Sequence, residues 1–561
     1  MLSPGNWFAV SKILNFREKM LVAFLSLVFI ASFGFWAERI FVNFTKPIPK
    51  FGGEYTEGIV GQPLYVNPLL SQTSEADSDL SRLIFSGLFK YDQQGKIVND
   101  LSEGYEISED KKSYTIRIRK NAKWHDGTEL TANDVLFTFN IIKDSAYKSP
   151  LRQNWQGVEI NKVDDYALRF DLKNPYFGFL DNLTVGILPK HIWENIPAER
   201  FSLMERNLRP VGSGPYAFVD FQKDSNGNII TYKLAAFKEY YEGSPYIAKI
   251  NFNFYPGDDA LIEAFNKKEV MGISNISPEK IVSLKTSKNF SIKEVVIPRY
   301  FSLFINQTKN VALAYDEVRK AMAISVNRQE IIDDVLEGKG IPLYTPLFPQ
   351  MKGYEDFSGE YAYNPEEAKK ILDNAGWNLN QDEGVRKKGE DKFEFEIITT
   401  DWPELVKSAE ILKRQWENIG AKVNIKILSV SDFQQNYIRT REYGSLLFGQ
   451  ALSFNPDFYS FWHSSNKRDP GLNMSLFENK EADELLDAIR QETDENKRAE
   501  DFGKLVRIIK EKNPTIFLYS QYYLYPISNS INGIDIKGIN SPSWRFADVN
   551  KWYIKTARVK K

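Results

Sequence analysis

The sequence predicts a large α/β protein that follows one N-terminal transmembrane helix. Its 561 residues are enough for two or three packed lobes. In the second half of the chain, a helical pattern at 405–419 ends at Gly420 and is followed by a strand-like run at 422–428. This succession of helix, glycine stop and strand is typical of an α/β lobe. The third observation is an uninterrupted apolar run at 20–36.

The composition excludes several classes of function. A net charge of −2 provides no overall field that would attract nucleic acid. The absence of cysteine excludes disulfides, thiol catalysis and thiolate metal sites. Aromatic residues make up 14% of the chain, and this high share suits either a binding cleft or large cores.

The apolar run at 20–36 is close to the minimum length for spanning a membrane. Lys12, Arg17 and Lys19 precede it, which favours an amino terminus inside the cell and the rest of the chain outside. A cleaved signal peptide is the alternative, but residues 32–34 are the only weak candidate for its cleavage site. We therefore favour an uncleaved anchor. The KPIPK sequence at 46–50 is interpreted as a stiff spacer, and the closing RVKK as a solvated terminus.

Residues 114–140 form the most informative stretch. Alternation from Tyr114 to Ile118 predicts a half-buried strand, and Asp126-Gly127 predicts a turn. Thr131 then precedes a helical pattern and has Asp134 three residues later, which predicts an N-cap of the capping-box type. We expect this strand, turn and capped helix to be scaffold.

Periodicity predicts further elements along the exported part. Helical spacing recurs at 258–265, at 316–336 with a break near Asn327, and at 366–375, 483–489 and 499–510. Strands are predicted at 216–221 and 250–255, and strand-like pieces at 516–527. The VGSGPY sequence at 211–216 lacks the lysine of a phosphate loop and predicts a tight bend.

No pattern in the sequence indicates an active site. The only histidines are His125, His191 and His463, and none belongs to an HExxH or other paired-histidine motif. A Gly-x-Ser-x-Gly nucleophile elbow is also absent. The sequence therefore predicts a protein that is not an enzyme and that holds no metal or cofactor.

Four blocks in order carry a resemblance to a known family. They are SGLFKYDQQGKIV through KWHDGTELTANDVLFTF at 86–140, VGSGPY at 211–216, the segment 304–340, and YNPEEAKKILDNAGW at 363–377. On these blocks the chain resembles extracytoplasmic solute-binding proteins of the peptide/nickel class, which serve ABC importers. It is most similar to the peptide-binding branch.

The resemblance implies a two-lobed α/β clamp of the periplasmic-binding-protein type with an inserted β-rich subdomain. Residues 1–51 would form the cytoplasmic stub, anchor and spacer. Lobe I would comprise 52–90, 207–298 and 521–561, the subdomain 91–206, and lobe II 299–520. Hinge strands would lie near 295–301 and 516–522, and the lobes would close around a ligand.

One position departs from the family pattern. Peptide binders of this family have an aspartate four residues before a proline, and this aspartate pairs with the ligand's α-ammonium group. Here Leu452 occupies that position, and a leucine cannot neutralise a buried cation. Either another acid such as Asp457 takes the role, or the ligand lacks a free amino terminus, or the alignment is displaced by a few residues. The expected ligand-contacting residues are Gln72, Thr73, Tyr300, Trp402, Gln450, Leu452, Phe454, Asn455 and Asp457.

The resemblance implies a receptor on the outer face of the cytoplasmic membrane or in the periplasm. It would capture an oligopeptide or similar solute and deliver it to an ABC permease with a cytoplasmic ATPase. We expect a monomer that is tethered by its N-terminal helix and that binds no nucleic acid. The alternatives are an exported hydrolase of peptides or glycans, and a signalling or adhesion module on the same fold.

Overall fold

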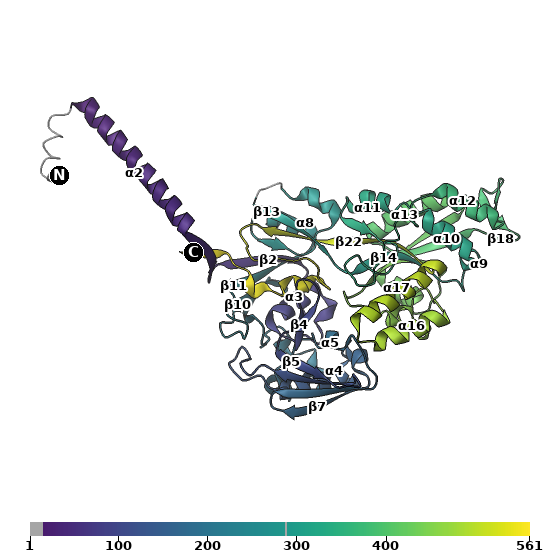
Figure 1. Ribbon diagram of the computed structural model, residues 1–561, viewed down its shortest axis with the longest axis horizontal. Coiled ribbons are helices and arrows are strands. Elements are labelled where there is room, and N and C mark those ends of the chain that lie inside the picture. The colour runs from purple at the N-terminus through teal and green to yellow at the C-terminus, as the bar shows by residue number, and fades with distance from the viewer. Residues whose placement is uncertain (1–14, 286–288) are drawn as a thin grey trace.

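The computed structural model describes residues 15–285 and 289–561, apart from the side chain of Thr73. Helix α2 (Phe16–Phe44) projects from a globular part in which a long sheet passes through two lobes (Figure 1). This arrangement agrees with the predicted two-lobed α/β architecture behind one apolar helix. Within the described residues, α2 is the one helix long and apolar enough to span a membrane, a test that a signal sequence also passes.

The largest sheet has twelve strands. Ten lie in the order β20 (Lys422–Leu428), β19 (Glu394–Thr400), β21 (Ser445–Ala451), β14 (Arg299–Ile305), β22 (Thr515–Ser528), β12 (Gly272–Ile273), β2 (Glu54–Val60), β11 (Lys249–Tyr255), β10 (Ile229–Ala236) and β9 (Tyr216–Lys223). Strands β13 (Phe290–Val296) and β15 (Gly340–Pro342) also pair with β22.

Strand β22 passes from one lobe to the other. Its first half pairs with β14, and its second half pairs with β13, where Val296 faces Tyr522. Strands β13 and β14 are themselves consecutive, with only Ile297 and Pro298 between them. The chain therefore crosses between the lobes twice, once along β22 and once from β13 to β14. The two crossings are paired side by side, in the two regions where hinge strands are expected. Movement about them remains a prediction.

The first lobe and the β-rich region share one hydrophobic core. This core joins α3 (Glu75–Ile84) to the sheet β5 (Ser102–Ile107), β6 (Ser113–Ile118), β8 (Ala167–Leu172) and β7 (Val158–Asp164), to the pair β3 (Phe89–Tyr91) and β4 (Ile97–Asn99), and to α4 (Ala132–Lys143), α5 (Phe179–Asn182), α6 (Lys190–Trp193) and α7 (Ala198–Phe201). Helix α8 (Asp258–Asn266) covers a small separate cluster. Residues 91–206 thus form a sheet of their own without a separate core.

The second lobe has its own core, which contains Trp377, Trp416 and Trp462. Its helices are α9 (Val311–Ala314), α10 (Asp316–Ile324), α11 (Arg328–Leu336), α12 (Pro365–Asn374), α13 (Pro403–Asn418), α14 (Val430–Phe433), α15 (Tyr459–Trp462), α16 (Lys480–Gln491) and α17 (Glu495–Lys512), and a small sheet comprises β16 (Asn378–Asn380), β17 (Val385–Lys388) and β18 (Asp391–Lys392). The predicted break near Asn327 is confirmed, because Asn327 caps α11 through its side chain.

The prediction for residues 114–140 is confirmed. Strand β6 is followed by a turn and by α4, and both hydrogen bonds of the Thr131–Asp134 capping box are present. His125 binds the VGSGPY bend, because Gly212 N donates to its Nδ1 (3.3 Å) and its Nε2 lies 3.0 Å from Gly214 O. Burial lowers the pKa of His125 to about 4, so the neutral ring holds the two motifs together.

The KPIPK segment differs from the expected isolated spacer. It forms β1 (Thr45–Lys50), which pairs antiparallel with the C-terminal strand β23 (Lys555–Lys560). Residues 558–560 of the RVKK tail belong to this strand, and all four residues are exposed, as expected of a solvated terminus. Proline is tolerated here because a two-stranded ribbon leaves one edge of each strand unpaired. Figure 1 shows this ribbon and the C-terminus at the base of α2.

Candidate functional site

A cavity of about 340 Å³, called here the interlobe cavity, is lined by both lobes and by β14 and β22, the two strands at the crossing between the lobes. The first lobe contributes Val60, Glu75, Asp258, Ser274, Asn275 and Ser277, the crossing strands contribute Arg299, Phe301 and Gln521, and the second lobe contributes Trp402, Glu404 and Leu405. A cavity between the lobes and next to their crossing strands changes shape whenever the lobes move, as a closing clamp requires.

Glu75 brings a carboxylate into the interlobe cavity from the first turn of α3, whose N-cap is Ser74. It accepts a hydrogen bond from Ser274 Oγ at 3.0 Å. Among the described residues, no cationic side chain lies within 4 Å of this carboxylate. Glu75 is therefore free to pair with a cationic group of a ligand.

Arg299 provides the opposite charge at the start of β14. Burial lowers the pKa of its guanidinium, while the negative charge of Glu75 opposes this shift. No carboxylate in the described part of the chain lies within ion-pair distance of Arg299. The interlobe cavity is thus lined by the Arg299 guanidinium and by three carboxylates, those of Glu75, Asp258 and Glu404. Of these three, Glu75 is the one whose charge acts on the pKa of Arg299.

Trp402 forms an apolar wall of the same cavity. It precedes α13 as its N-cap residue, and 44% of its surface is exposed. Its ring lies 6.4 Å from that of Phe448, centroid to centroid, at an angle of 38°. An exposed tryptophan held by a neighbouring ring offers a rigid apolar contact at low entropic cost. The cavity is therefore suited to a molecule with charges of both signs and an apolar side chain.

A second cavity of about 720 Å³ separates residues 153–182 of the β-rich region from residues 451–491 of the second lobe. Leu452 and Asp457 line it. Burial raises the pKa of Asp457, but Arg490 Nη2 lies 3.2 Å from its carboxylate and Tyr176 also bonds it. Asp457 already has a cationic partner, so it is a poor acceptor for a ligand's ammonium group.

Comparison with known proteins identifies the family of this chain. Residues 96–471 match the model of bacterial extracellular solute-binding proteins, family 5. The chain belongs to this family. It is a solute-binding protein and not a member of an enzyme family.

Relatives of the solute-binding protein cover nearly its whole length. The oligopeptide-binding protein AppA of Bacillus subtilis (strain 168) is 28% identical, over 90% of this chain and 92% of that protein. The structure of AppA with a nonapeptide superposes with a TM-score of 0.71 at 27% identity, covering 91% of this chain and all of AppA. The dipeptide-binding protein of Escherichia coli (strain K12) is 26% identical, over 84% of this chain and 90% of that protein.

Two of the expected ligand contacts of this solute-binding protein lie in the core of its second lobe. Tyr300 is fully buried, and its hydroxyl donates to Gln450 Oε1. Gln450 Nε2 in turn donates to Leu472 O at 2.9 Å. Because neither residue lines the cavities described above and both have partners, we leave them out of the candidate site. Strand β14 alternates its side chains, and its inward face carries Tyr300 away from the cleft.

The segment 452–455 connects the lobes. Leu452 N donates to Pro298 O at 2.6 Å. Phe454 N donates to Asn540 Oδ1 at 2.8 Å, and its ring lies between Gly95 and Gly538, where an added Cβ would come within 2.6 and 2.9 Å of it. Asn455 Nδ2 lies 3.4 Å from Asp181 Oδ2. Phe454 and Asn455 therefore link the second lobe to the first lobe and to the β-rich region.

Of the remaining predicted contacts, Trp402 lies in the interlobe cavity and Gln72 lines a smaller cavity nearby. Gln72 Nε2 donates to Pro68 O at 2.6 Å. The side chain of Thr73 lies outside the described residues. Sequence reasoning missed Glu75 and Arg299, although Glu75 lies two residues beyond Thr73 and Arg299 directly precedes Tyr300.

Proposed function

We propose that this solute-binding protein captures peptides with a free amino terminus and a free carboxylate in the interlobe cavity, and delivers them to an ABC importer. The observation that carries the proposal is the presence of unpaired Glu75 and Arg299 in one cavity with exposed Trp402. The peptide-binding relatives support the substrate class.

In this proposal, Glu75 takes the role of the aspartate that is missing at Leu452. Its carboxylate accepts from the ligand's α-ammonium group, and Arg299 donates to the carboxylate of the same ligand. Charge-assisted hydrogen bonds of this kind are stronger than neutral ones, and a guanidinium can bind a carboxylate through two of them. Trp402 then covers an apolar side chain of the peptide.

We predict that Glu75→Gln weakens binding of a free tripeptide about tenfold to a hundredfold, because a hydrogen bond to a charged group contributes roughly 1.5–3 kcal/mol. The same peptide with an acetylated amino terminus should bind the variant and the wild type equally. Isothermal titration calorimetry measures both affinities. Glu263→Gln is the matched control, since Glu263 pairs with Lys267 on the surface of α8. Equal tripeptide affinities for Glu75→Gln and wild type would contradict this assignment.

Arg299→Gln should show the reciprocal preference. Its affinity for the free tripeptide should be about tenfold or more below that of the wild type. Its affinity for the C-terminal amide of the same peptide should change little, since only the free carboxylate needs a cation.

A thermal-shift screen of peptides and nickel chelates tests the substrate class itself. If no peptide stabilises the wild-type protein while a nickel chelate does, the peptide proposal is wrong.

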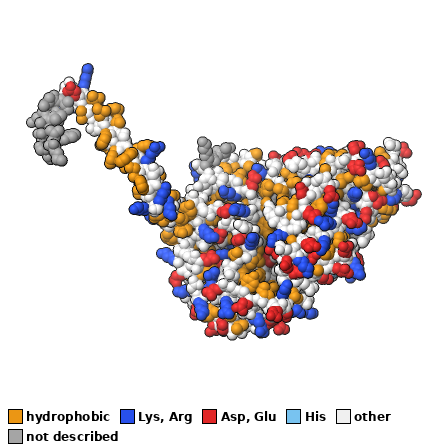
Figure 2. Space-filling model, viewed as in Figure 1, with side chains coloured by type: hydrophobic (Ala, Val, Ile, Leu, Met, Phe, Trp, Pro, Cys, Tyr) orange, Lys and Arg blue, Asp and Glu red, His pale blue; other side chains and the backbone are white. Residues whose placement is uncertain are grey.

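We further propose that α2 is retained as a membrane anchor. Arg558 of β23 donates through Nη2 to Val42 O and to Thr45 O, both at 3.0 Å, so the C-terminal strand binds the last turn of α2. Hydrophobic side chains cover α2 and Lys or Arg side chains gather at its base (Figure 2). Intact-mass measurement of protein from membranes should give the full chain, and a mass that begins after Gly34 would contradict retention.

A further inference from the structure

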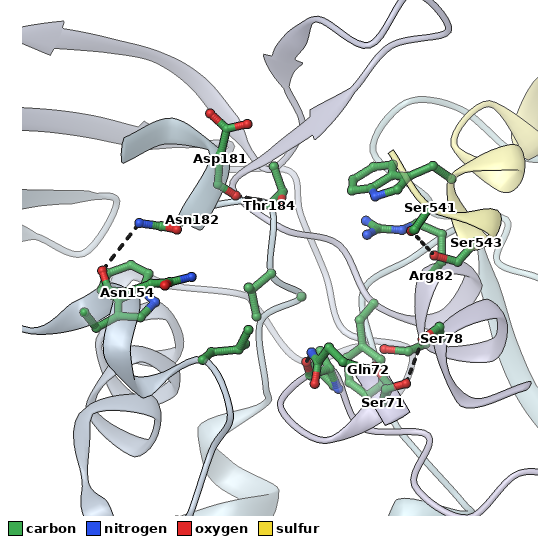
Figure 3. Close-up of a pocket in the computed structure, with 18 residues that line it drawn as sticks. Ser71, Gln72, Ser78, Arg82, Asn154, Asp181, Asn182, Thr184, Ser541 and Ser543 are labelled. Carbon is green, nitrogen blue, oxygen red and sulfur yellow. Dashed lines mark hydrogen bonds between the residues drawn. The ribbon is translucent and has the colours of Figure 1, made fainter. Parts of the chain in front are cut away.

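A third cavity, of about 250 Å³, lies between the first lobe and the β-rich region and is called here the Arg82 pocket. Its walls come from α3, from η1 (Ser71–Thr73), from residues 151–155 and 181–186, and from η8 (Pro542–Phe546) (Figure 3). Among the described residues, none from the second lobe lines it. The Arg82 pocket is therefore a separate site from the interlobe cavity.

Arg82 is a half-buried cation that lines this pocket. Its guanidinium stacks 3.3 Å from the ring centroid of Trp544, which fixes the plane of the group. Its Nε is buried and has no hydrogen-bond partner, and no described carboxylate lies within 4 Å of its nitrogens. Burial lowers the pKa of Arg82 to about 10, so the side chain is still charged at neutral pH.

Among the described residues, Asp181 is the one acid that lines the pocket, and it does not pair with Arg82. Asp181 accepts from the Tyr91 hydroxyl and lies near the Asn455 amide, and burial raises its pKa to about 6. Figure 3 shows Arg82 on the opposite side of the pocket from Asp181 and next to Ser541 and Ser543. The two serine hydroxyls lie 3.3 Å apart and offer further donors beside the guanidinium.

We propose that the Arg82 pocket binds a carboxylate or another small oxyanion. Arg82 lines the pocket without an ion-pair partner among the described residues, and a planar guanidinium flanked by hydroxyls matches the two oxygens of a carboxylate. Ser78 and Gln72 close the pocket on the side of η1, where Ser78 Oγ donates to Ser71 O at 2.7 Å. The anion is either free in solution or an acidic side chain of a peptide bound in the cleft.

The spacing of Glu75 and Arg82 on α3 fits the second source, a peptide whose amino terminus is bound at Glu75. Arg82 lies seven residues after Glu75 on α3, which corresponds to about 10 Å along the helix axis. A peptide extends by roughly 3.3 Å per residue, so its third residue lies about 7 Å from an amino terminus at Glu75, and the side chain of a glutamate there covers the remaining distance. This second source rests on the proposed function, and the first does not.

The test uses the full chain in nanodiscs with acetate, succinate, inorganic phosphate and two tripeptides, one neutral and one with a C-terminal glutamate. Calorimetry should show that Arg82→Gln weakens binding of at least one probe anion, or of the glutamate peptide, tenfold or more. Binding of the neutral tripeptide should be unchanged. Arg507→Gln is the matched control, since exposed Arg507 pairs with Glu355 outside the pocket. Arg82→Lys should retain part of the affinity.

The outcomes separate the two proposals. Loss of free-anion binding in Arg82→Gln supports a soluble anion, and loss of only the glutamate preference supports the peptide source. Anion binding without any peptide binding would leave the Arg82 pocket in place and overturn the peptide proposal. If Arg82→Gln binds every probe as the wild type does, or if no probe anion and no glutamate preference is found in the wild type, the inference is wrong. Circular dichroism and neutral-tripeptide affinity confirm that the variant is folded.

Discussion

Arg545→Met should lower the free energy of unfolding by about 3–5 kcal/mol, the usual cost of removing one partner of a buried ion pair. Arg545 is buried in η8 and donates to Asp79 Oδ1 at 2.9 Å and to Glu57 Oε1 at 2.8 Å. The variant leaves both carboxylates buried without a cation. Urea denaturation followed by circular dichroism measures the change as a lower transition midpoint.

Two further variants make this result specific. Arg507→Met removes an exposed pair with Glu355 and should cost no more than about 1 kcal/mol. Adding Asp79→Asn to Arg545→Met removes one of the two orphaned charges and should recover part of the lost stability. A midpoint for Arg545→Met equal to that of Arg507→Met would show that the buried network contributes nothing. Because the network joins α3 to η8, its loss should also loosen Arg82 against Trp544.

Local patterns predicted the individual elements well. The strand 422–428 agrees residue by residue with β20, and the capped helix after Thr131 is α4. These elements depend on side chains a few residues apart, through caps, glycine stops and periodicity, which a single sequence displays directly. The matched family blocks then provided the two-lobed arrangement, which local patterns do not contain.

Contacts between distant segments could not be predicted in the same way. The prolines at 47 and 49 indicated a spacer, whereas the strand they belong to pairs with residues some 500 positions later. Tyr300 and Arg299 are neighbours in the sequence, yet one enters the core and the other the cavity, because β14 alternates its faces. Alternation shows that two faces exist but does not identify the one toward the cleft.

Charged site residues are the hardest to find from the sequence. Glu75, Arg82 and Arg299 belong to a set of 72 basic and 74 acidic residues, and no local motif distinguishes them. Each lines a cavity and has no oppositely charged side chain of the described residues within ion-pair distance, and this depends on which other segments fold nearby. The departure at Leu452 suggested another acid as one alternative, and we propose Glu75 for that role because Asp457 already pairs with Arg490.

Gly212→Ala should destabilise the protein by about 3 kcal/mol, at the upper end of the usual cost of overpacking. A Cβ at Gly212 would lie 1.9 Å from Ile84 O, which is backbone at the end of α3. The glycine cannot move away easily, because His125 N donates to its carbonyl at 2.8 Å and Gly214 N donates to Ile84 O at 2.7 Å. Thermal unfolding of the purified variant measures the loss.

Gly359→Ala is the matched control, because Gly359 is exposed and an added Cβ there meets no atom within 4 Å. It should unfold at the temperature of the wild type, and equal unfolding temperatures for both variants would contradict the predicted clash. If Gly212→Ala folds, its free-tripeptide affinity should fall, since the displaced end of α3 moves the helix that carries Glu75. The VGSGPY bend would then act on ligand binding through the position of α3, as scaffold that touches no ligand itself.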